Sequence, residues 1–126
     1  MNCFGKSACL ALALAGIVGA AAADEDQAQA GRQVFDQRCR TCHGGTARAD
    51  LPIGPSLSGI VGSGAGTGAS GIHSRAVMDS GIVWDRARLR RFLSNPEREI
   101  PGTLMAVSVR DRTELESLLD YLETLH

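Results

Sequence analysis

The stretch Cys39-Arg40-Thr41-Cys42-His43 decides the fold predicted for this chain, because it places two thiols and an imidazole side by side. Residues three positions apart share one side of a helical turn. Cys39 and Cys42 can therefore each form a thioether with one vinyl group of a single haem, and a C-x-x-C-H sequence is the attachment pattern of haem c. His43 then lies beneath the ring, where its imidazole can bind the iron as the proximal ligand.

A C-x-x-C sequence also occurs in redox dithiols of thioredoxin-like folds and as half of a zinc site. The dithiol interpretation needs a βαβ context, and the sequence has no sustained strand pattern. The zinc interpretation needs further ligands, but the only other cysteines, Cys3 and Cys9, lie in a predicted signal peptide. We therefore interpret the stretch as the attachment site of one covalent haem c.

Residues 1–23 have the features of a secretory signal peptide. Lys6 supplies the positive charge, residues 8–19 form a short apolar segment, and Ala21-Ala22-Ala23 fits a small-x-small cleavage site. A retained membrane anchor is the alternative, but the apolar segment is near the lower length limit for a membrane span. We expect cleavage, a single mature domain of residues 24–126, and a location in the bacterial periplasm.

The composition limits the size, charge and core of the protein. The chain has 126 residues, enough for one domain, and a formal net charge of -1, which gives no sign of nucleic-acid binding. It has one Trp, one Tyr and three Phe, beside 15 Gly. A small domain with few large side chains buries little apolar surface of its own. A bound haem would supply the missing core.

Two helices are predicted by their first residues and apolar spacing. The acidic triplet Asp24-Glu25-Asp26 suits the start of a helix over about residues 26–38, which leads into the C-x-x-C-H stretch. Asp85 is the predicted N-cap of a second helix from Arg86 to Ser94. The arginines of this second helix are predicted to face solvent: Arg86, Arg88, Arg90 and Arg91.

A short helix and a long C-terminal helix are predicted in the same way. Ser74 is the expected cap of a short helix through Met78, and Asp111-Arg112-Thr113-Glu114 resembles a capping box. An apolar stripe at helical spacing follows it: Leu115, Leu118, Leu119, Leu122 and Leu125. We interpret this stripe as core and not as a cofactor contact.

Residues 44–71 are rich in Gly, Ser, Ala and Pro and are predicted to form loops. Within them Pro55 can present a rigid carbonyl. An iron-bound imidazole needs an acceptor for its other N–H, so the Pro55 carbonyl is a candidate partner of His43; an ordinary turn is the alternative. The Gly-rich residues 62–71 are either a flexible linker or an Ω loop over a cofactor edge.

Four side chains are candidates for the sixth iron ligand: Met78, Met105, His73 and His126. His126 ends the chain and is expected to fray. Met78, the main competitor, falls in the predicted short helix, whereas Met105 lies in a Pro-Gly loop that can hold a thioether far from His43 in sequence. Because methionine more often fills a core, this chemistry favours Met105 only modestly.

These motifs, taken together in their order, resemble the class I cytochromes c of the mitochondrial type and their soluble bacterial relatives. The resemblance runs from about Gly31 to Leu125. The matching features are Gly31 with Phe35, Cys39 to His43, Gly54-Pro55-Ser56-Leu57, Gly81 to Asp85, Asn95-Pro96, Pro101 to Met105, and Leu118 with Tyr121. The resemblance implies an all-α fold in which the N- and C-terminal helices cross and loops wrap around one covalent haem.

The resemblance also implies residue roles. Met105 would be the distal ligand, Pro55 would accept a hydrogen bond from His43, and Thr103 would steady the methionine loop. Trp84 would donate its indole N–H to a haem propionate; a core tryptophan is the alternative. Gly31 and Phe35 would pack against the C-terminal helix.

The sequence departs from the family pattern at two positions. Ser63 stands where the family usually has a basic residue, and His73 stands where it often has a tyrosine. Solvation of the propionates is therefore open. His73 could replace the tyrosine as a donor, could tie the reduction potential to pH by titrating near neutrality, or could simply be exposed.

The implied function is that of a monohaem electron carrier, not an enzyme, which passes single electrons between membrane or periplasmic redox partners. Reductases and oxidases or dehydrogenases are the expected partners, with transient docking and a monomeric state. The family's docking lysines are absent, so a basic docking face would consist of arginines: Arg38, Arg40, Arg48 and Arg75. A sensor haem protein and a peroxidase-like enzyme are the rival interpretations. Both require a vacant distal position.

Overall fold

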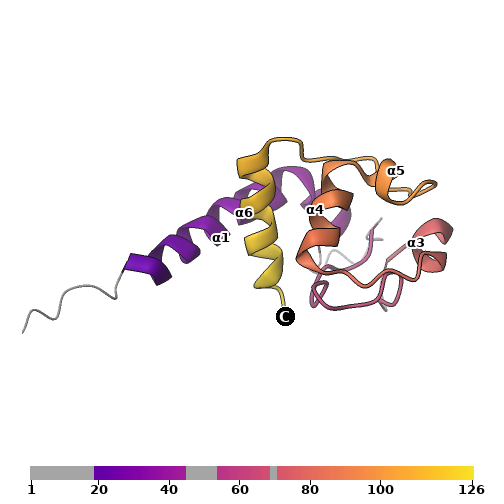
Figure 1. The fold of residues 1–126 in the computed structure, drawn as a ribbon, viewed down its shortest axis with the longest axis horizontal. Helices are drawn as coiled ribbons and strands as arrows, with labels where there is room; N and C mark the ends of the chain where they lie inside the picture. The colour runs from indigo at the N-terminus through magenta and orange to yellow at the C-terminus, as the bar shows by residue number, and fades with distance from the viewer. Residues whose placement is uncertain (1–18, 45–53, 69–70) are drawn as a thin grey trace, which may run out of the picture.

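The computed structural model describes residues 19–44, 54–68 and 71–126. These residues form six helices, drawn in Figure 1: α1 (Gly19–Arg38), α2 (Arg40–His43), α3 (Arg75–Asp79), α4 (Arg86–Ser94), α5 (Pro96–Glu99) and α6 (Arg112–Glu123). The one extended pairing in the described ranges is an isolated antiparallel bridge between Gly64 and Val83. The fold is therefore all-α, as predicted. None of the described helices is both long and apolar enough to span a membrane.

The helix predicted over residues 26–38 begins seven residues earlier, at Gly19 of α1. The acidic triplet 24–26 consequently lies in the second turn and not at the helix start, so that prediction is wrong. The cause is the alanine run before Asp24, which has a high helix propensity. Residues 22–27 are exposed, and α1 extends beyond α6 at this end (Figure 1). Helix α1 would therefore keep its buried part in a chain that began at Asp24.

The crossing of α1 and α6 confirms the predicted contact between the terminal helices (Figure 1). Gly31 permits it, since a Cβ there would lie 1.8 Å from the backbone oxygen of Ser117. Phe35 and Tyr121 pack beside this point with ring centroids 5.4 Å apart. The Ser117 hydroxyl, itself buried, donates a hydrogen bond to Gln27 Oε1 at 3.1 Å. Both backbone proximity and side-chain packing therefore fix the crossing.

Helix α6 carries its predicted leucine stripe into the core, and Leu118 is completely buried. The helix starts as expected, because the Asp111 side chain accepts a hydrogen bond from Glu114 N. Helices α3 and α4 also have their predicted caps, Ser74 and Asp85. The single-turn helix α5 was not predicted: Asn95 caps it and Pro96 fills a first-turn position. One turn is too short to leave an apolar period in the sequence.

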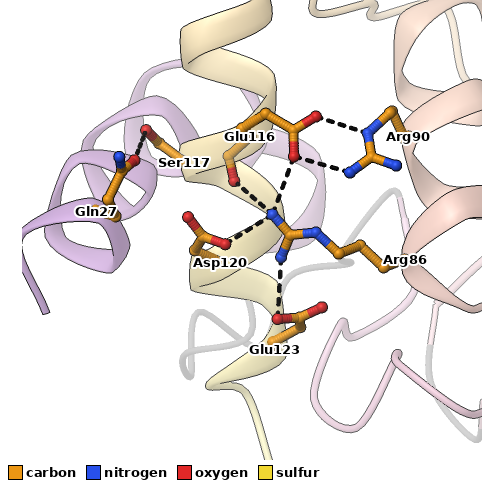
Figure 2. A network of polar contacts seen from close by, with 7 residues as sticks. All are labelled: Gln27, Arg86, Arg90, Glu116, Ser117, Asp120 and Glu123. Carbon is orange, nitrogen blue, oxygen red and sulfur yellow. Dashed lines mark hydrogen bonds and ion pairs between the residues drawn. The ribbon is translucent and has the colours of Figure 1, made fainter. Parts of the chain in front are cut away.

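The arginines predicted to face solvent from α4 are instead paired with carboxylates. Arg86 reaches Glu116, Asp120 and Glu123 of α6 at 3.0, 2.7 and 3.0 Å (Figure 2). Arg90 holds both oxygens of Glu116 at 2.6 and 2.9 Å. Two further arginines of α4, Arg88 and Arg91, both contact Glu99 of α5. This network ties α4 to α5 and α6. No local sequence pattern predicts it, because the paired residues lie on different helices.

Candidate functional site

The loops and helices surround a cavity of about 450 Å³. All seven site residues predicted from the sequence line it: Cys39, Cys42, His43, Pro55, Trp84, Thr103 and Met105. They come from α2 and from three separate loops, so only the tertiary fold brings them together. The volume is in the range of about 300–1,000 Å³ that small-molecule and cofactor pockets occupy.

The two thiols enter the cavity from the end of α1 and from α2. The helical path continues through them, because Cys39 N donates to Phe35 O and His43 N donates to Cys39 O, both at 2.8 Å. Both cysteines are free, and Cys39 is buried. Burial raises the pKa of the Cys39 thiol to about 11, so this sulfur is protonated near neutral pH. No three side chains of metal-binding type come together in the described ranges, which gives the zinc alternative no support.

The His43 imidazole is held by its own loop. Its Nδ1 lies 2.8 Å from Pro55 O, and because a carbonyl can only accept, Nδ1 is the donor. This hydrogen bond leaves Nε2 without a proton in the neutral ring, as a metal ligand requires. Gly54 allows the approach, since a Cβ there would lie 2.7 Å from His43 Cε1. The need for glycine at this position was missed in the sequence.

The methionine loop forms another part of the cavity wall. It follows α5, and its half-buried Met105 donates its backbone N–H to Thr103 Oγ1 at 3.3 Å. Among the competing sixth ligands, Met78 is 47% exposed and does not line the cavity, and neither does His126. His73 lines it. The placement therefore leaves Met105 and His73 as the two candidates near the site.

Trp84 is buried between the cavity and α4, where its ring packs on Phe92 at a centroid distance of 4.9 Å. Its backbone is fixed by hydrogen bonds with Ser63 O and Gly62 N, at 2.9 and 2.7 Å. Trp84 thus lies on the cavity wall in a fixed position.

The leucine stripe of α6 also reaches the cavity, which the sequence interpretation missed. Leu118 and Leu122 line it together with Leu89, Phe92 and Leu93 of α4. The prediction that the stripe forms core is confirmed, and two of its leucines also form part of the cavity wall. Helical spacing does not distinguish a core contact from a ligand contact. Leucines that pack on other leucines and leucines that pack on an apolar ligand recur with the same helical period in the sequence.

Crossed terminal helices around an apolar cavity with a C-x-x-C-H turn define an all-α, c-type haem protein. The cytochrome c family model matches residues 28–126. The chain is 36% identical to cytochrome c2 of Rhodomicrobium vannielii over 97 residues, covering 76% of this chain and 77% of that protein. It is 34% identical to cytochrome c-550 of Bradyrhizobium diazoefficiens over 96 residues, covering 75% and 70%.

A solved structure agrees with the sequence relatives. Cytochrome cH from Methylobacterium extorquens superposes with a TM-score of 0.67 at 36% identity, over 77% of this chain and 97% of that chain. The chain belongs to the cytochrome c family. It is an electron-transfer protein with one covalently attached haem c, and it works with redox partners. The cavity fits that group, since it offers two free thiols, an oriented imidazole, a thioether and apolar walls.

Proposed function

We propose that Cys39 and Cys42 hold the haem through thioether bonds, that His43 and Met105 are its axial iron ligands, and that the protein shuttles single electrons in the periplasm. The observation that carries this proposal is the convergence of the two thiols, the Met105 thioether and the His43 imidazole on one cavity. When bound, the haem supplies a one-electron Fe(III)/Fe(II) couple. His/Met ligation and a buried ring both favour the Fe(II) state.

The chain's own residues orient and shield this group. Pro55 O fixes the His43 ring and its tautomer. Thr103 restrains the backbone of Met105. Trp84 would donate its indole N–H to a haem propionate, in keeping with its place on the cavity wall. The Met105 thioether would fill the distal position, which argues against a sensor or a peroxidase-like enzyme.

Residues 1–23 would direct export and then be removed, leaving a monomer that begins at Asp24. This part of the proposal rests on the sequence pattern alone. Mass spectrometry of protein recovered from the periplasm of an expressing bacterium gives the test. We expect the mass of residues 24–126 plus one haem; retention of residues 1–23 would mean an anchored protein.

The ligand assignment is tested by the weak far-red absorption band of thioether-ligated ferric haem. We expect the band in the wild type and its loss in Met105→Ala, because no other sulfur in the described ranges shares the cavity with Met105 except the two cysteines. Met78→Ala is the matched control and should keep the band, since Met78 does not line the cavity.

His73→Ala should also keep the band. A band that survives Met105→Ala, or one that disappears in Met78→Ala, would refute the assignment of Met105. A band absent from the wild type would leave the His73 imidazole as the side chain to examine.

A further inference from the structure

The loops around the haem cavity carry almost no charge. Residues 54–74 and 100–109 contain no Asp, Glu, Lys or Arg, and His73 is their one titratable side chain. Many residues of these two segments line the cavity. The helices carry the charge instead, for example in the network between α4 and α6 (Figure 2). The charged and uncharged parts of the molecule are therefore separate.

Most of the exposed apolar side chains in the described ranges lie in these two uncharged segments. Four of the six exposed large hydrophobic residues do so, namely Val61, Ile72, Leu104 and Val107, whereas Met78 lies in α3 and Val83 in the loop before α4. Three of the six also line the cavity, with exposed fractions of 62% for Ile72, 74% for Leu104 and 39% for Val107. A side chain that lines a cavity and is also exposed borders its opening. We call Ile72, Leu104 and Val107 the cavity rim.

Three of the four arginines expected to form a basic docking face are each paired with a carboxylate. Arg38 lines the cavity but contacts Glu114 at 2.9 Å. Arg40 contacts Asp36 at 3.1 Å, and Arg75 contacts Asp79 at 2.8 Å. In each pair the carboxylate offsets the charge of its arginine, so the pair adds no net charge to the surface. Arg48 lies outside the described residues, in the segment 45–53, which also contains Asp50.

We propose that the cavity rim is the docking face for a redox protein whose own electron-transfer site is surrounded by uncharged, apolar side chains. The proposal rests on the proposed function, since it requires that the cavity hold the haem. Contact with such a partner removes apolar surface from water on both sides. A charged partner surface would lose its hydration against the rim and find no opposite charge on its three side chains. Small apolar contacts also suit the weak, transient docking of electron carriers.

Electron self-exchange of the haem-loaded protein tests this proposal, because two copies present the required chemistry to each other. The rate is measured from NMR line widths in mixtures of oxidised and reduced protein. For the wild type we expect a change of less than about threefold between about 10 mM and about 500 mM salt. A rate that rises or falls steeply with salt would contradict an uncharged docking face.

Two rim variants and a matched control distinguish the effect of a charge placed at the rim from the effect of a change in net charge. Ile72→Glu and Leu104→Glu should each slow self-exchange about fivefold or more at low salt, because like charges then face each other and apolar contact is lost. Added salt should restore part of the rate. Ala87→Glu makes the same change of net charge on an exposed α4 residue outside the cavity lining and should stay within about twofold of the wild type. An equal slowing by Ala87→Glu would overturn the proposal.

Val107→Thr replaces a methyl group by a hydroxyl at nearly constant shape and should slow exchange several-fold at every salt concentration. Every variant is first checked for the far-red band. Slower exchange with the band intact tests the docking face, because the iron ligands are then unchanged. Absence of the band in the wild type would instead contradict the proposed iron ligands. An independent readout is the dependence of backbone amide shifts on concentration in the reduced protein. Shifts should cluster at 71–74 and 103–107; a cluster on α4 and α6 would overturn the assignment.

Discussion

At the scale of single residues, Gly54 controls how closely the backbone approaches the His43 imidazole. A Cβ at this position would lie 2.7 Å from Cε1 and 2.9 Å from Nδ1 of the ring. We expect Gly54→Ala to turn the ring away from Pro55 O and to lower the free energy of unfolding of the holoprotein by about 1–3 kcal/mol. Denaturant titration followed by haem absorbance measures the loss.

Gly68→Ala is the matched control for this prediction. Gly68 also lines the cavity, but among the described residues a Cβ there meets nothing closer than His73 Nε2, at 3.5 Å. We expect a change of less than about 0.5 kcal/mol. Equal losses in the two variants would show that contact with His43 is not the cause.

The residues of the site differ in how far the sequence could reveal them. Cys39, Cys42 and His43 are neighbours in the chain, so their spacing alone predicts a common site. Pro55 and Met105 needed both the chemistry of haem ligation and a family resemblance. The close approach of Gly54 to His43 and the place of Trp84 on the cavity wall depend on segments brought together by folding. No local pattern records such contacts.

At the scale of elements, Gly31 fixes the crossing of α1 and α6. A Cβ there would meet the backbone of Ser117, which cannot move without displacing the helix. We expect Gly31→Ala to destabilise the holoprotein by about 2–4 kcal/mol, although alanine favours an isolated helix by about 1 kcal/mol. Ala30→Gly, at the exposed neighbouring position, should cost only about 1 kcal/mol. A stabilised Gly31→Ala variant would contradict the close crossing.

The arginine network between α4 and α6 makes the stability of the fold depend on pH. Hydrogen bonds from Arg90 lower the pKa of Glu116 to about 2, and those from Arg86 add to the effect. Because this pKa lies below its value of about 4.3 in an unfolded chain, the stabilisation is complete above about pH 5. It is lost as the pH falls through 4 and on toward 2.

We therefore expect Glu116→Gln to lower the free energy of unfolding by about 1–2 kcal/mol at pH 7, a figure reduced for the partial exposure of the side chain. The difference from the wild type should shrink between about pH 5 and about pH 2. Denaturant titrations across this range provide the measurement. Glu25→Gln changes an exposed carboxylate of α1 and serves as the control. A difference that stays constant with pH would show that the pairing contributes nothing.

The elements themselves were predictable where capping residues and apolar spacing agree. Helices α4 and α6 begin after the expected Asp85 and Asp111. The start of α1 was misplaced because the alanine run of the predicted signal peptide is also a strong helix former. The ion pairs of α4 could not be foreseen, since the sequence does not say which helix its arginines face.

At the scale of the whole molecule, the cavity lies inside the hydrophobic core and not beside it. Its walls include Leu118, Leu122 and Phe92, which are also core residues. Left without a group to fill it, this cavity would leave its apolar walls without packing partners or in contact with water. That loss is serious for a small domain, whose whole stability is only about 5–15 kcal/mol.

The haem should therefore be required for folding as well as for electron transfer. We expect the double variant Cys39→Ser/Cys42→Ser, purified without haem, to lack a cooperative unfolding transition and to bind a hydrophobic dye. Met105→Ala, which loses one ligand but keeps the covalent group, should remain folded with a measurable transition. Circular dichroism with thermal unfolding distinguishes the two. Cooperative, native-like unfolding of the haem-free variant would show that the helices close the core unaided, and the scarcity of large side chains would then need another explanation.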